Sequence, residues 1–241
     1  MTAAVDRLEP TTRFVLTNAV YFKGTWLTAF DPAKTQPAPF TTVSGAVRQV
    51  PMMESSLPVR YAQTDGIHAI WLPYQGERVQ MLIVAPSEQA HVDSVKHALQ
   101  KIPLAELVRS LDGGQSKMIV RVKVPRFTMQ FAADVSSILT QHGLAQPFSA
   151  AADYRAIGSG QGTISVLHRA VLEVNESGTT AAATTAVTSD RALAGEPPTF
   201  SADKPFLVAI IDRATDATLF AGYMADFGED QAQSLRKTGT Q

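Results

Sequence analysis

Short runs of apolar residues recur along the chain and predict mainly strands. The clearest run, from Phe14 to Lys23, is rich in Val, Phe and Tyr and ends at Gly24, with Asn18 as a polar exception. A run that is apolar on both faces predicts a central, buried strand. Further runs predict strands at 67–73, 79–85, 163–174, 206–211 and 218–223.

Turn residues and alternating charges place the weaker strands. Tyr74-Gln75-Gly76-Glu77 separates two apolar runs and predicts a hairpin. Residues 118–127 alternate with basic residues, as a half-exposed strand does. Residues 47–53 and 59–63 predict two short strands around Pro58, and we expect the proline-rich segment 32–39 to be a loop.

Three segments have the periodicity of helices. Residues 92–99 and 104–111 repeat apolar positions at helical spacing and are separated by Pro103. Residues 132–142 predict a third helix that ends at Gly143. Strands therefore outnumber the few helices, and no internal repeat is visible. This pattern predicts an α+β fold with antiparallel-rich sheets.

The segment 173–190, EVNESGTTAAATTAVTSD, differs from all of these elements. From Thr179 to Ser189 it has no charge, proline or glycine and no side chain larger than Val187. A flexible linker usually contains more Gly, Ser or Pro, and a surface helix carries spaced charges. Because strand side chains alternate between faces, the small set that begins at Thr179 suits entry into a core. The segment therefore indicates a loop that can also join a sheet, and the alternative is an Ala/Thr-rich linker.

The composition is that of an ordinary globular protein. Of 241 residues, 45% are hydrophobic and 18% charged, and the net charge is −1. This balance predicts neither a nucleic-acid nor a membrane partner, and no apolar run approaches the ~18 residues of a membrane span. Cysteine is absent, which excludes disulfides and thiol chemistry. No signal peptide is visible, because residues 1–12 lack an apolar core.

Patterns typical of enzymes and metal sites are missing from the sequence. The five histidines, at 68, 91, 97, 142 and 168, form no HExxH motif and have no carboxylate at metal-ligand spacing. No GxSxG nucleophile motif occurs. Residues 158–162, GSGQG, superficially resemble a phosphate-binding loop but lack the Lys-Ser/Thr that follows in such loops. We therefore expect no enzymatic activity, no metal and no cofactor.

Six blocks of sequence, taken in order, carry a much more specific signal. They are FVLTNAVYFKGTW at 14–26, VPMMESS at 50–56, IWLPYQGERVQMLIVAPSE at 70–88, VKVPRFTMQ at 122–130, VLHRAVLEVNESGT at 166–179 and FSADKPFLVAIIDRATDATLFAGYMADF at 200–227. These blocks, and the Ala/Thr-rich segment 173–190 that begins within the fifth of them, resemble the serpins, a family of serine protease inhibitors.

The resemblance implies a partial serpin domain. It implies one domain over residues 1–241 with a mixed, antiparallel-rich α+β fold; residues 5–227 match the family, and 228–241 are expected to be a disordered tail. The match begins about midway through a serpin. We therefore expect a truncated chain that lacks the first helices and two strands of the large sheet, and that does not inhibit proteases alone.

The resemblance also implies how a complete inhibitor acts. In serpins the target protease cleaves an exposed loop, which then inserts as a new strand into the large sheet and distorts the protease. The native fold is metastable, and the inhibitor performs no catalysis of its own. The implied partner is a serine protease, and an extracellular location is favoured. Self-association through the large sheet is a further expectation.

The resemblance assigns a hinge and an inserting loop. The hinge begins at Glu176 and passes through Gly178, which can pivot. The side chains that would enter the sheet are Thr179, Ala181, Ala183 and Thr185. Arg126 stands where serpins carry a basic residue, so we expect an ion pair between Arg126 and Glu176.

The resemblance also assigns a sheet-opening cluster of Asn18, His168 and Trp26. Asn18 and His168 interrupt apolar runs in the two strands that must part. Since buried polar groups need partners, we expect these two side chains to lie within hydrogen-bonding reach. The alternative is that each is satisfied elsewhere, and an ordinary core tryptophan would look the same as Trp26.

Counting along the loop from Glu176 places the reactive bond between Ala192 and Leu193. A small residue before this bond suits elastase-like or subtilisin-like proteases. The spacing from Glu176 to Pro205 is longer than in common serpins, so cleavage between Arg191 and Ala192 is the alternative. That bond would suit a trypsin-like protease, whose pocket is acidic.

Two other functions fit the same resemblance. The chain could be a non-inhibitory serpin-like binding or chaperone protein. Such proteins often carry bulky, charged or proline residues in the hinge, which this sequence lacks. It could also be an inactive fragment that only associates through sheet edges.

Overall fold

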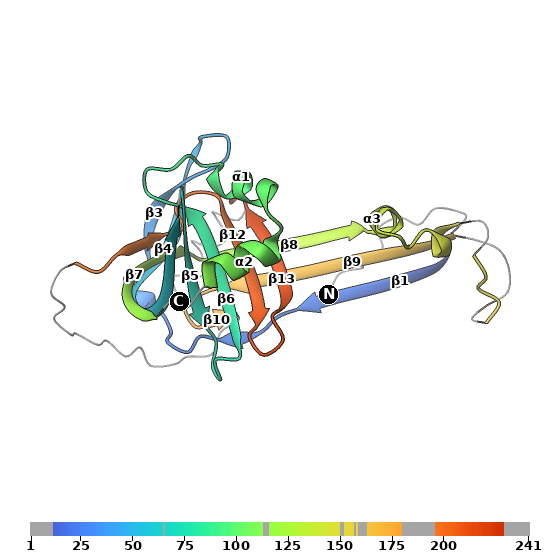
Figure 1. Cartoon of the computed structure of the whole chain (residues 1–241), viewed down its shortest axis with the longest axis horizontal. Helices are drawn as coiled ribbons and strands as arrows, with labels where there is room; N and C mark the ends of the chain where they lie inside the picture. Colours follow the sequence, from blue (N-terminus) through green and yellow to red (C-terminus); the bar gives the residue numbers. More distant parts are fainter. Residues whose placement is uncertain are drawn as a thin grey trace. The chain divides into compact units, whose positions relative to one another are not determined.

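The computed structural model describes residues 12–64, 66–112, 116–149, 152–156, 158, 163–179 and 196–228. The chain forms two compact units (Figure 1). Unit 1 comprises residues 1–22 and 129–172, and unit 2 comprises residues 23–128 and 173–241. No helix among the described residues is both long and apolar enough to cross a membrane. That both units belong to one domain over 1–241 stays a prediction, and the expected tail after Gly228 lies outside the described residues.

Unit 1 is built on a three-stranded sheet with the order β1-β9-β8. Its elements are β1 (Thr12–Tyr21), β8 (Phe127–Asp134), β9 (Thr163–Val174), the helix α3 (Ser136–Gln141) and the short 3₁₀ helix η2 (Gln146–Phe148). β1 and β9 are parallel and paired along nearly their whole length. β9 has the bounds that the sequence predicted.

The first strand of unit 1 is less buried than the sequence predicted. β1 forms in the predicted region, but it lies at the edge of its sheet. Leu16 is 54% exposed and Tyr21 is 52% exposed. The prediction of a central, buried strand is therefore wrong for the described structure. An apolar run favours burial, but burial also needs neighbours on both edges and both faces.

The third predicted helix is shorter than expected. Residues up to Asp134 continue β8, and α3 begins only at Ser136. The Asp134 carboxylate accepts a hydrogen bond from the Ser136 amide at 2.8 Å, which stabilises the start of the helix there. Gly143, with φ of 95°, follows the last turn as predicted.

Unit 2 contains an eight-stranded sheet with the path β11-β7-β4-β5-β6-β12-β13, and β3 pairs beside it with β4. The strands are β3 (Gln36–Thr41), β4 (Val47–Thr64), β5 (Ile67–Pro73), β6 (Val79–Pro86), β7 (Lys117–Pro125), β11 (Thr199–Ser201), β12 (Phe206–Asp212) and β13 (Ala217–Met224). All pairings are antiparallel except that of β11 with β7. The predicted α+β class with antiparallel-rich sheets is confirmed.

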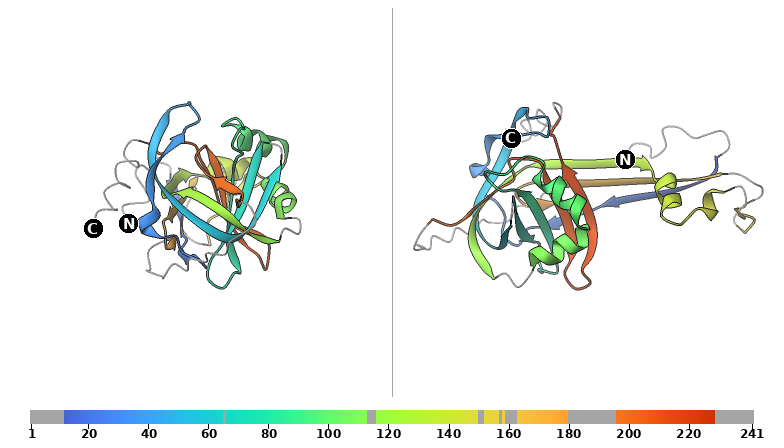
Figure 2. Two further views of the ribbon diagram at one scale, coloured as in Figure 1. Left: turned by 90° about the vertical axis from the view of Figure 1, so that its left-hand side faces the viewer. Right: turned by 45° about the horizontal axis from the view of Figure 1, so that its top comes forward.

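The helices α1 (Ser94–Lys101) and α2 (Leu104–Asp112) cover one face of this sheet (Figure 2). Val95 and Leu107 from the helices share a core with Trp71 and Leu82 from the strands. Burial of each large apolar side chain of this kind contributes about 1.5–3 kcal/mol. The strands are also buried on their other face, where Ile83 is 0% exposed. The two-sided burial explains why β5, β6 and β12 read as continuous apolar runs.

The hairpin and the two helices of unit 2 agree with the sequence, but two proline-containing segments do not. Residues 47–64 form one long strand, β4, instead of two short strands. Around Pro58 this strand pairs with β7 only, because its pairing with β5 begins at Arg60, so the missing N–H is tolerated. The expected loop 32–39 contains a 3₁₀ turn, η1 (Pro32–Lys34), and the start of β3, which pairs with β4.

Candidate hinge site

The chain makes a tight turn directly after β9. The amide of Asn175 donates to the carbonyl of Gly178 at 2.9 Å, and the amide of Gly178 donates back to the carbonyl of Asn175 at 3.1 Å. The side chain of Asn175 also accepts from the Ser177 amide at 3.0 Å. The chain therefore reverses its direction within the hinge, before the loop begins.

Gly178 is the residue that this turn requires. Its φ is 138°, which L side chains rarely adopt. The short strand β10 (Gly178–Thr179) pairs with β2 (Gly24–Thr25), and a Cβ on Gly178 would collide with the carbonyl oxygen of Gly24. The sequence predicted a pivot at Gly178, whereas the structure also shows a close backbone contact there.

Glu176 sits in a buried ion pair with Arg126. The Arg126 Nη2 and the Glu176 Oε1 are 2.5 Å apart, and the Nε donates to both carboxylate oxygens at 2.6 and 2.8 Å. The side chains are 15% and 7% exposed. Such a bidentate arrangement is the strong form of the arginine–carboxylate interaction.

Neighbouring elements hold both members of the pair. Arg126 lies between β7 and β8, and its amide donates to the carbonyl of Pro51 at 2.8 Å. Thr35, the residue after η1, donates its hydroxyl to the Glu176 carboxylate at 2.5 Å. The Glu176 carbonyl accepts from the Phe30 amide at 2.9 Å. Both the backbone and the side chain of Glu176 are therefore fixed.

Thr179 is completely buried at the start of the loop. Its exposed fraction is 0%, and its hydroxyl shares a 2.8 Å hydrogen bond with the hydroxyl of Tyr74. Burial raises the pKa of Tyr74 well above its usual value, so the phenol stays protonated near neutral pH. The ring of Tyr74 stacks on Trp26 at 4.5 Å, and the Trp26 indole donates to the Asn175 carbonyl at 2.9 Å.

Trp26 therefore lies in the hinge site, but the other two residues assigned to the sheet-opening cluster belong to unit 1. Asn18 and His168 are register partners on the adjacent strands β1 and β9. Among the described residues no hydrogen bond joins them. Asn18 is exposed and free to bind water, and the ring of His168 lies 5.9 Å from that of Phe131. The expected hydrogen bond presumed burial, which Asn18 does not have here.

Most of the assigned loop lies outside the described residues. This holds for Ala181, Ala183, Thr185, Arg191, Ala192 and Leu193. The structure thus describes the two ends of the loop, Thr179 and Glu196, and not the reactive bond.

Sequence reasoning missed three members of the site: Thr35, Tyr74 and Asn175. Tyr74 was assigned only to a hairpin turn, and Thr35 to a loop. The one available signal was Tyr74 in the block IWLPYQGERVQMLIVAPSE, since a buried tyrosine needs a partner for its hydroxyl. No described group of three or more His, Cys, Asp or Glu side chains could hold a metal ion. The contacts of the site hold the backbone of residues 175–179 in place.

Comparison with known proteins agrees with these features. The family model described as Serpin (serine protease inhibitor) matches residues 1–227. An uncharacterized serpin-like protein of Thermococcus kodakarensis is 34% identical over 91% of this chain and 51% of its own length. Intracellular coagulation inhibitor 2 of Tachypleus tridentatus is 32% identical over 92% of this chain and 55% of its own length.

A solved structure is similar as well. The thermophilic serpin tengpin in its native state superimposes with a TM-score of 0.76 at 26% identity, covering 92% of this chain and 58% of tengpin. The chain therefore spans a little over half the length of the relatives that it matches. The family model covers far more than half of the 241 residues, and the chain belongs to the serpin family.

Proposed function

We propose that the full-length gene product inhibits a serine protease by cleavage of its loop 180–195 and insertion of this loop into a sheet. The observation that carries the proposal is the hinge site. Glu176 and Thr179 are fixed by buried polar contacts immediately before the small, uncharged residues 180–189. Membership of the serpin family and the similarity to a coagulation inhibitor support it. In this proposal the protease performs the only catalytic step.

The direction of the hinge supports insertion as a strand. The turn at residues 175–178 reverses the chain after β9, so a strand that continued from Thr179 would run antiparallel to β9. Antiparallel strands can be joined by such a tight turn, whereas parallel strands need a long crossover. In this proposal the loop enters between β1 and β9.

The energetics of insertion favour the same proposal. The pairing of β1 with β9 extends from Thr12 to Tyr21 and would be replaced by two new ladders, one on each side of the inserted strand. One ladder is thus gained, with about 1 kcal/mol for each hydrogen bond. The small side chains at 179, 181, 183 and 185 add neither a buried charge nor a steric clash. The native state would then persist because of a barrier.

For the target we propose an elastase-like or subtilisin-like protease. This follows from the assignment of the reactive bond to Ala192–Leu193, since a small residue fits a shallow apolar pocket. A trypsin-like protease corresponds to cleavage after Arg191.

Mixing the full-length gene product with elastase, subtilisin and trypsin separately tests the proposal. We expect a complex that survives denaturing electrophoresis with elastase or subtilisin, and a cleavage product that begins at Leu193. Complete cleavage without any stable complex would contradict inhibition. A product that begins at Ala192, formed with trypsin, would correct the reactive bond and leave the mechanism in place.

A further inference from the structure

One short segment, residues 30–35, contacts Glu176 through both the backbone and the side chain of that residue. The Phe30 amide donates to the Glu176 carbonyl at 2.9 Å. Five residues later, the Thr35 hydroxyl donates to the Glu176 carboxylate at 2.5 Å. Residues 30–35 therefore hold the first residue of the hinge at two points, and we call them the hinge clamp.

The hinge clamp is itself fixed at both ends. The Phe30 side chain is buried in the core, with 2% of its surface exposed. The Asp31 side chain accepts from the Ala33 amide at 3.0 Å, which stabilises the 3₁₀ turn η1. β3 begins directly after Thr35 and pairs with β4. Because the backbone on either side of Thr35 is fixed, its hydroxyl has a defined position relative to the hinge.

The hydrogen bond from Thr35 is difficult to replace. Its acceptor is the carboxylate of the ion pair with Arg126, and hydrogen bonds to charged groups are about twice as strong as neutral ones. The Glu176 side chain is only 7% exposed, so water has little access to the carboxylate when the hydroxyl is removed. A buried charged group that loses a partner is destabilised more than an exposed one. Loss of this single hydroxyl should therefore loosen the hinge measurably.

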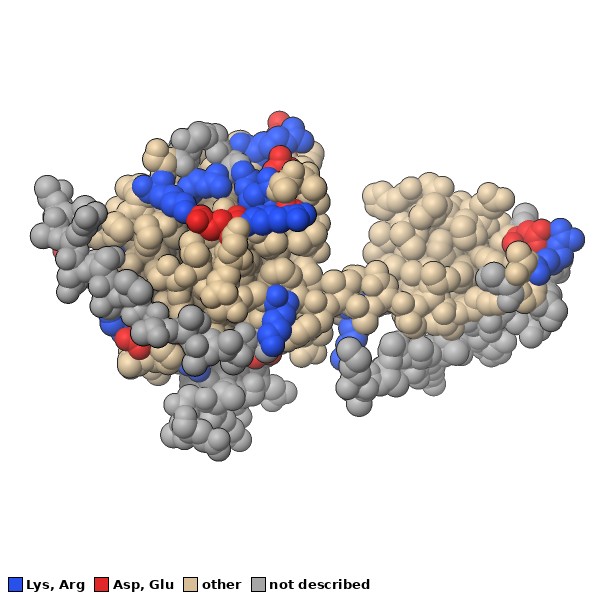
Figure 3. Space-filling model, turned by 90° about the horizontal axis from the view of Figure 1, so that it is seen from below, with Lys and Arg blue, Asp and Glu red and all other residues tan. Residues whose placement is uncertain are grey.

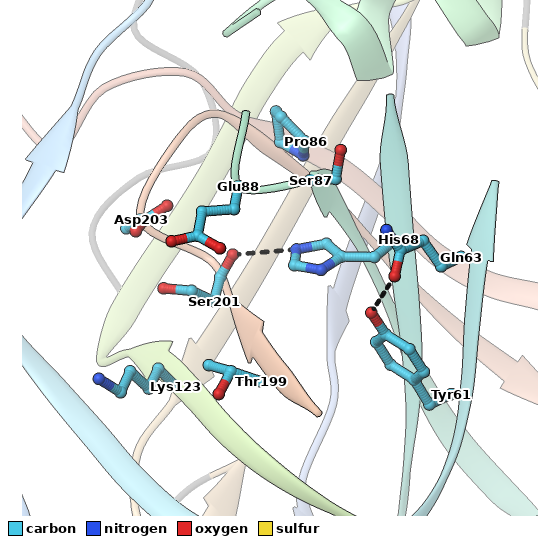
Figure 4. Close-up of a pocket in the computed structure, with 10 residues that line it drawn as sticks. All are labelled: Tyr61, Gln63, His68, Pro86, Ser87, Glu88, Lys123, Thr199, Ser201 and Asp203. Atoms are coloured by element: carbon cyan, nitrogen blue, oxygen red, sulfur yellow. Dashed lines mark hydrogen bonds between the residues drawn. The ribbon is translucent and has the colours of Figure 1, made fainter. Parts of the chain in front are cut away.

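The other end of the loop 180–195 is held by different contacts. There β11 pairs with β7 beside a polar cavity of about 420 Å³ (Figure 4). The His68 side chain points toward Ser201, and its Nε2 lies 3.2 Å from the Ser201 carbonyl oxygen. The Ala202 amide donates to the Lys123 carbonyl at 2.9 Å. The hinge clamp does not line this cavity, so this end of the loop provides an internal control.

We propose that Thr35 is a positioning residue of the hinge, and that through Glu176 it keeps the loop from entering the sheet before a protease cleaves it. While Glu176 is held, the turn at residues 175–178 stays closed and Thr179 stays paired with β2. When Glu176 is released, the turn opens more often and the loop gains the freedom to insert uncleaved. The effect on insertion rests on the proposed function, whereas the effect on the turn does not.

Amide hydrogen exchange of the 241-residue protein tests the effect on the turn. We expect Thr35→Val to speed exchange at the Phe30 and Gly178 amides about tenfold and to leave the Ala202 amide unchanged. Thr35→Ser keeps the hydroxyl and should exchange like the unsubstituted protein. Thr42→Val is the matched control, because its buried hydroxyl bonds within the β3–β4 connection instead. Equal exchange in the Val and Ser variants at position 35, or equal effects of Thr35→Val and Thr42→Val, would overturn the proposal.

A double-mutant cycle tests whether Thr35 acts through Glu176. In the Glu176→Ala background, Thr35→Val should change exchange at the Gly178 amide less than twofold. A tenfold change in that background would overturn the route through Glu176. Should Glu176→Ala fail to fold, the comparison of Val with Ser at position 35 still decides whether the hydroxyl holds the hinge.

Incubation of the full-length gene product without a protease tests the effect on the loop. At intervals, a protease is added and the fraction that still forms a stable complex is measured. We expect Thr35→Val to lose this ability about fivefold faster than the unsubstituted protein, and Thr35→Ser to lose it at the unchanged rate. Equal rates would overturn the effect on insertion. If the unsubstituted protein forms no complex, the proposed function fails with it, whereas the effect on the turn is decided by the exchange measurements alone.

Discussion

The two units build their sheets from similarly apolar strands, but only one unit buries them. In unit 2 every residue of β12 is buried, and β5 and β6 are almost completely buried. In unit 1 the described residues of β1 are half-buried or exposed. Burial rather than strand formation thus distinguishes the two, and we infer that most of the folding free energy resides in unit 2.

The surfaces of the two units also differ, in how many charged side chains they carry. On the face seen in Figure 3, Lys and Arg side chains gather around Asp and Glu on unit 2, whereas unit 1 presents mostly uncharged residues. Leu16, Tyr21 and Phe131 are each about half exposed. Exposed apolar surface of this kind favours association. Unit 1 is therefore the part of the chain that we expect to open first and to associate.

The largest contrast is expected between two phenylalanines. Phe206→Ala removes a completely buried ring of unit 2 and should cost about 4 kcal/mol of unfolding free energy. Phe131→Ala, in unit 1, removes a ring that is 48% exposed and should cost less than about 1 kcal/mol. Urea unfolding followed by circular dichroism is suitable, because the strands of both units contribute to it, whereas Trp26 and Trp71 both belong to unit 2. Equal effects would contradict the assignment of stability to unit 2.

Within unit 2, the hinge ion pair should matter far more than a surface pair. Arg126→Ala leaves the buried Glu176 carboxylate without its cation and should cost about 3 kcal/mol. Lys117→Ala breaks a pair with Glu77 in which both side chains are about half exposed, and should cost at most about 1 kcal/mol. Urea titrations of the two variants compare their unfolding free energies. Glu176→Lys, which places two cations together, should also increase polymerisation in size-exclusion chromatography.

A pair of glycines distinguishes close packing from backbone strain. Gly178→Ala combines a strained φ with a collision against Gly24 and should cost about 2–3 kcal/mol. Gly76 also has a positive φ, 82°, but there is open space around its Cβ position, so Gly76→Ala is expected to cost about 1 kcal/mol. The difference between the two unfolding free energies measures the close approach of β10 to β2. Equal values would mean that β10 and β2 do not pair.

The smallest effect concerns acid stability. Hydrogen bonds from the Arg78 guanidinium, and then from the Ala214 amide, lower the pKa of Asp212 to about 2. A depressed folded-state pKa contributes stability that is present above about pH 4 and is lost as the pH falls toward 2. In Arg78→Ala the unfolding free energy of unit 2 should therefore decrease less between pH 4 and 2 than in the unsubstituted protein. Tryptophan fluorescence measures this decrease. Arg155→Ala, which frees Asp153 in unit 1, should leave this signal unchanged.

Strand formation could be predicted from the sequence because apolar periodicity is local information. β5, β6, β9 and β12 lie within one residue of their predicted bounds. The exposure of β1 could not be predicted, because it depends on which segments pair with it in space. The continuous strand β4 was missed because Pro58 normally ends a strand, and only the register with β7 and β5 shows why it does not.

The hinge site was predictable only in part for the same reason. The resemblance located Arg126, Glu176, Gly178, Thr179 and Trp26, which lie together in unit 2. Thr35 and Tyr74 are far from the hinge in sequence, and their hydrogen bonds to Glu176 and Thr179 depend on the folded sheet. The expected bond between Asn18 and His168 stays unsupported, since it requires a buried environment.

The central claim, that the loop inserts with Thr179 facing inward, is tested most directly by two arginine substitutions in the full-length gene product. Thr179→Arg buries an unpaired guanidinium, and slowing insertion by about 2–3 kcal/mol lowers its rate about a hundredfold. In Thr180→Arg the charged side chain would lie on the opposite face of the inserted strand, which points to solvent. The measurement is the ratio of stable protease complex to cleaved inhibitor for the protease that the unsubstituted protein traps. We predict mostly cleaved protein for Thr179→Arg and an almost unchanged ratio for Thr180→Arg; equal ratios would contradict the claim.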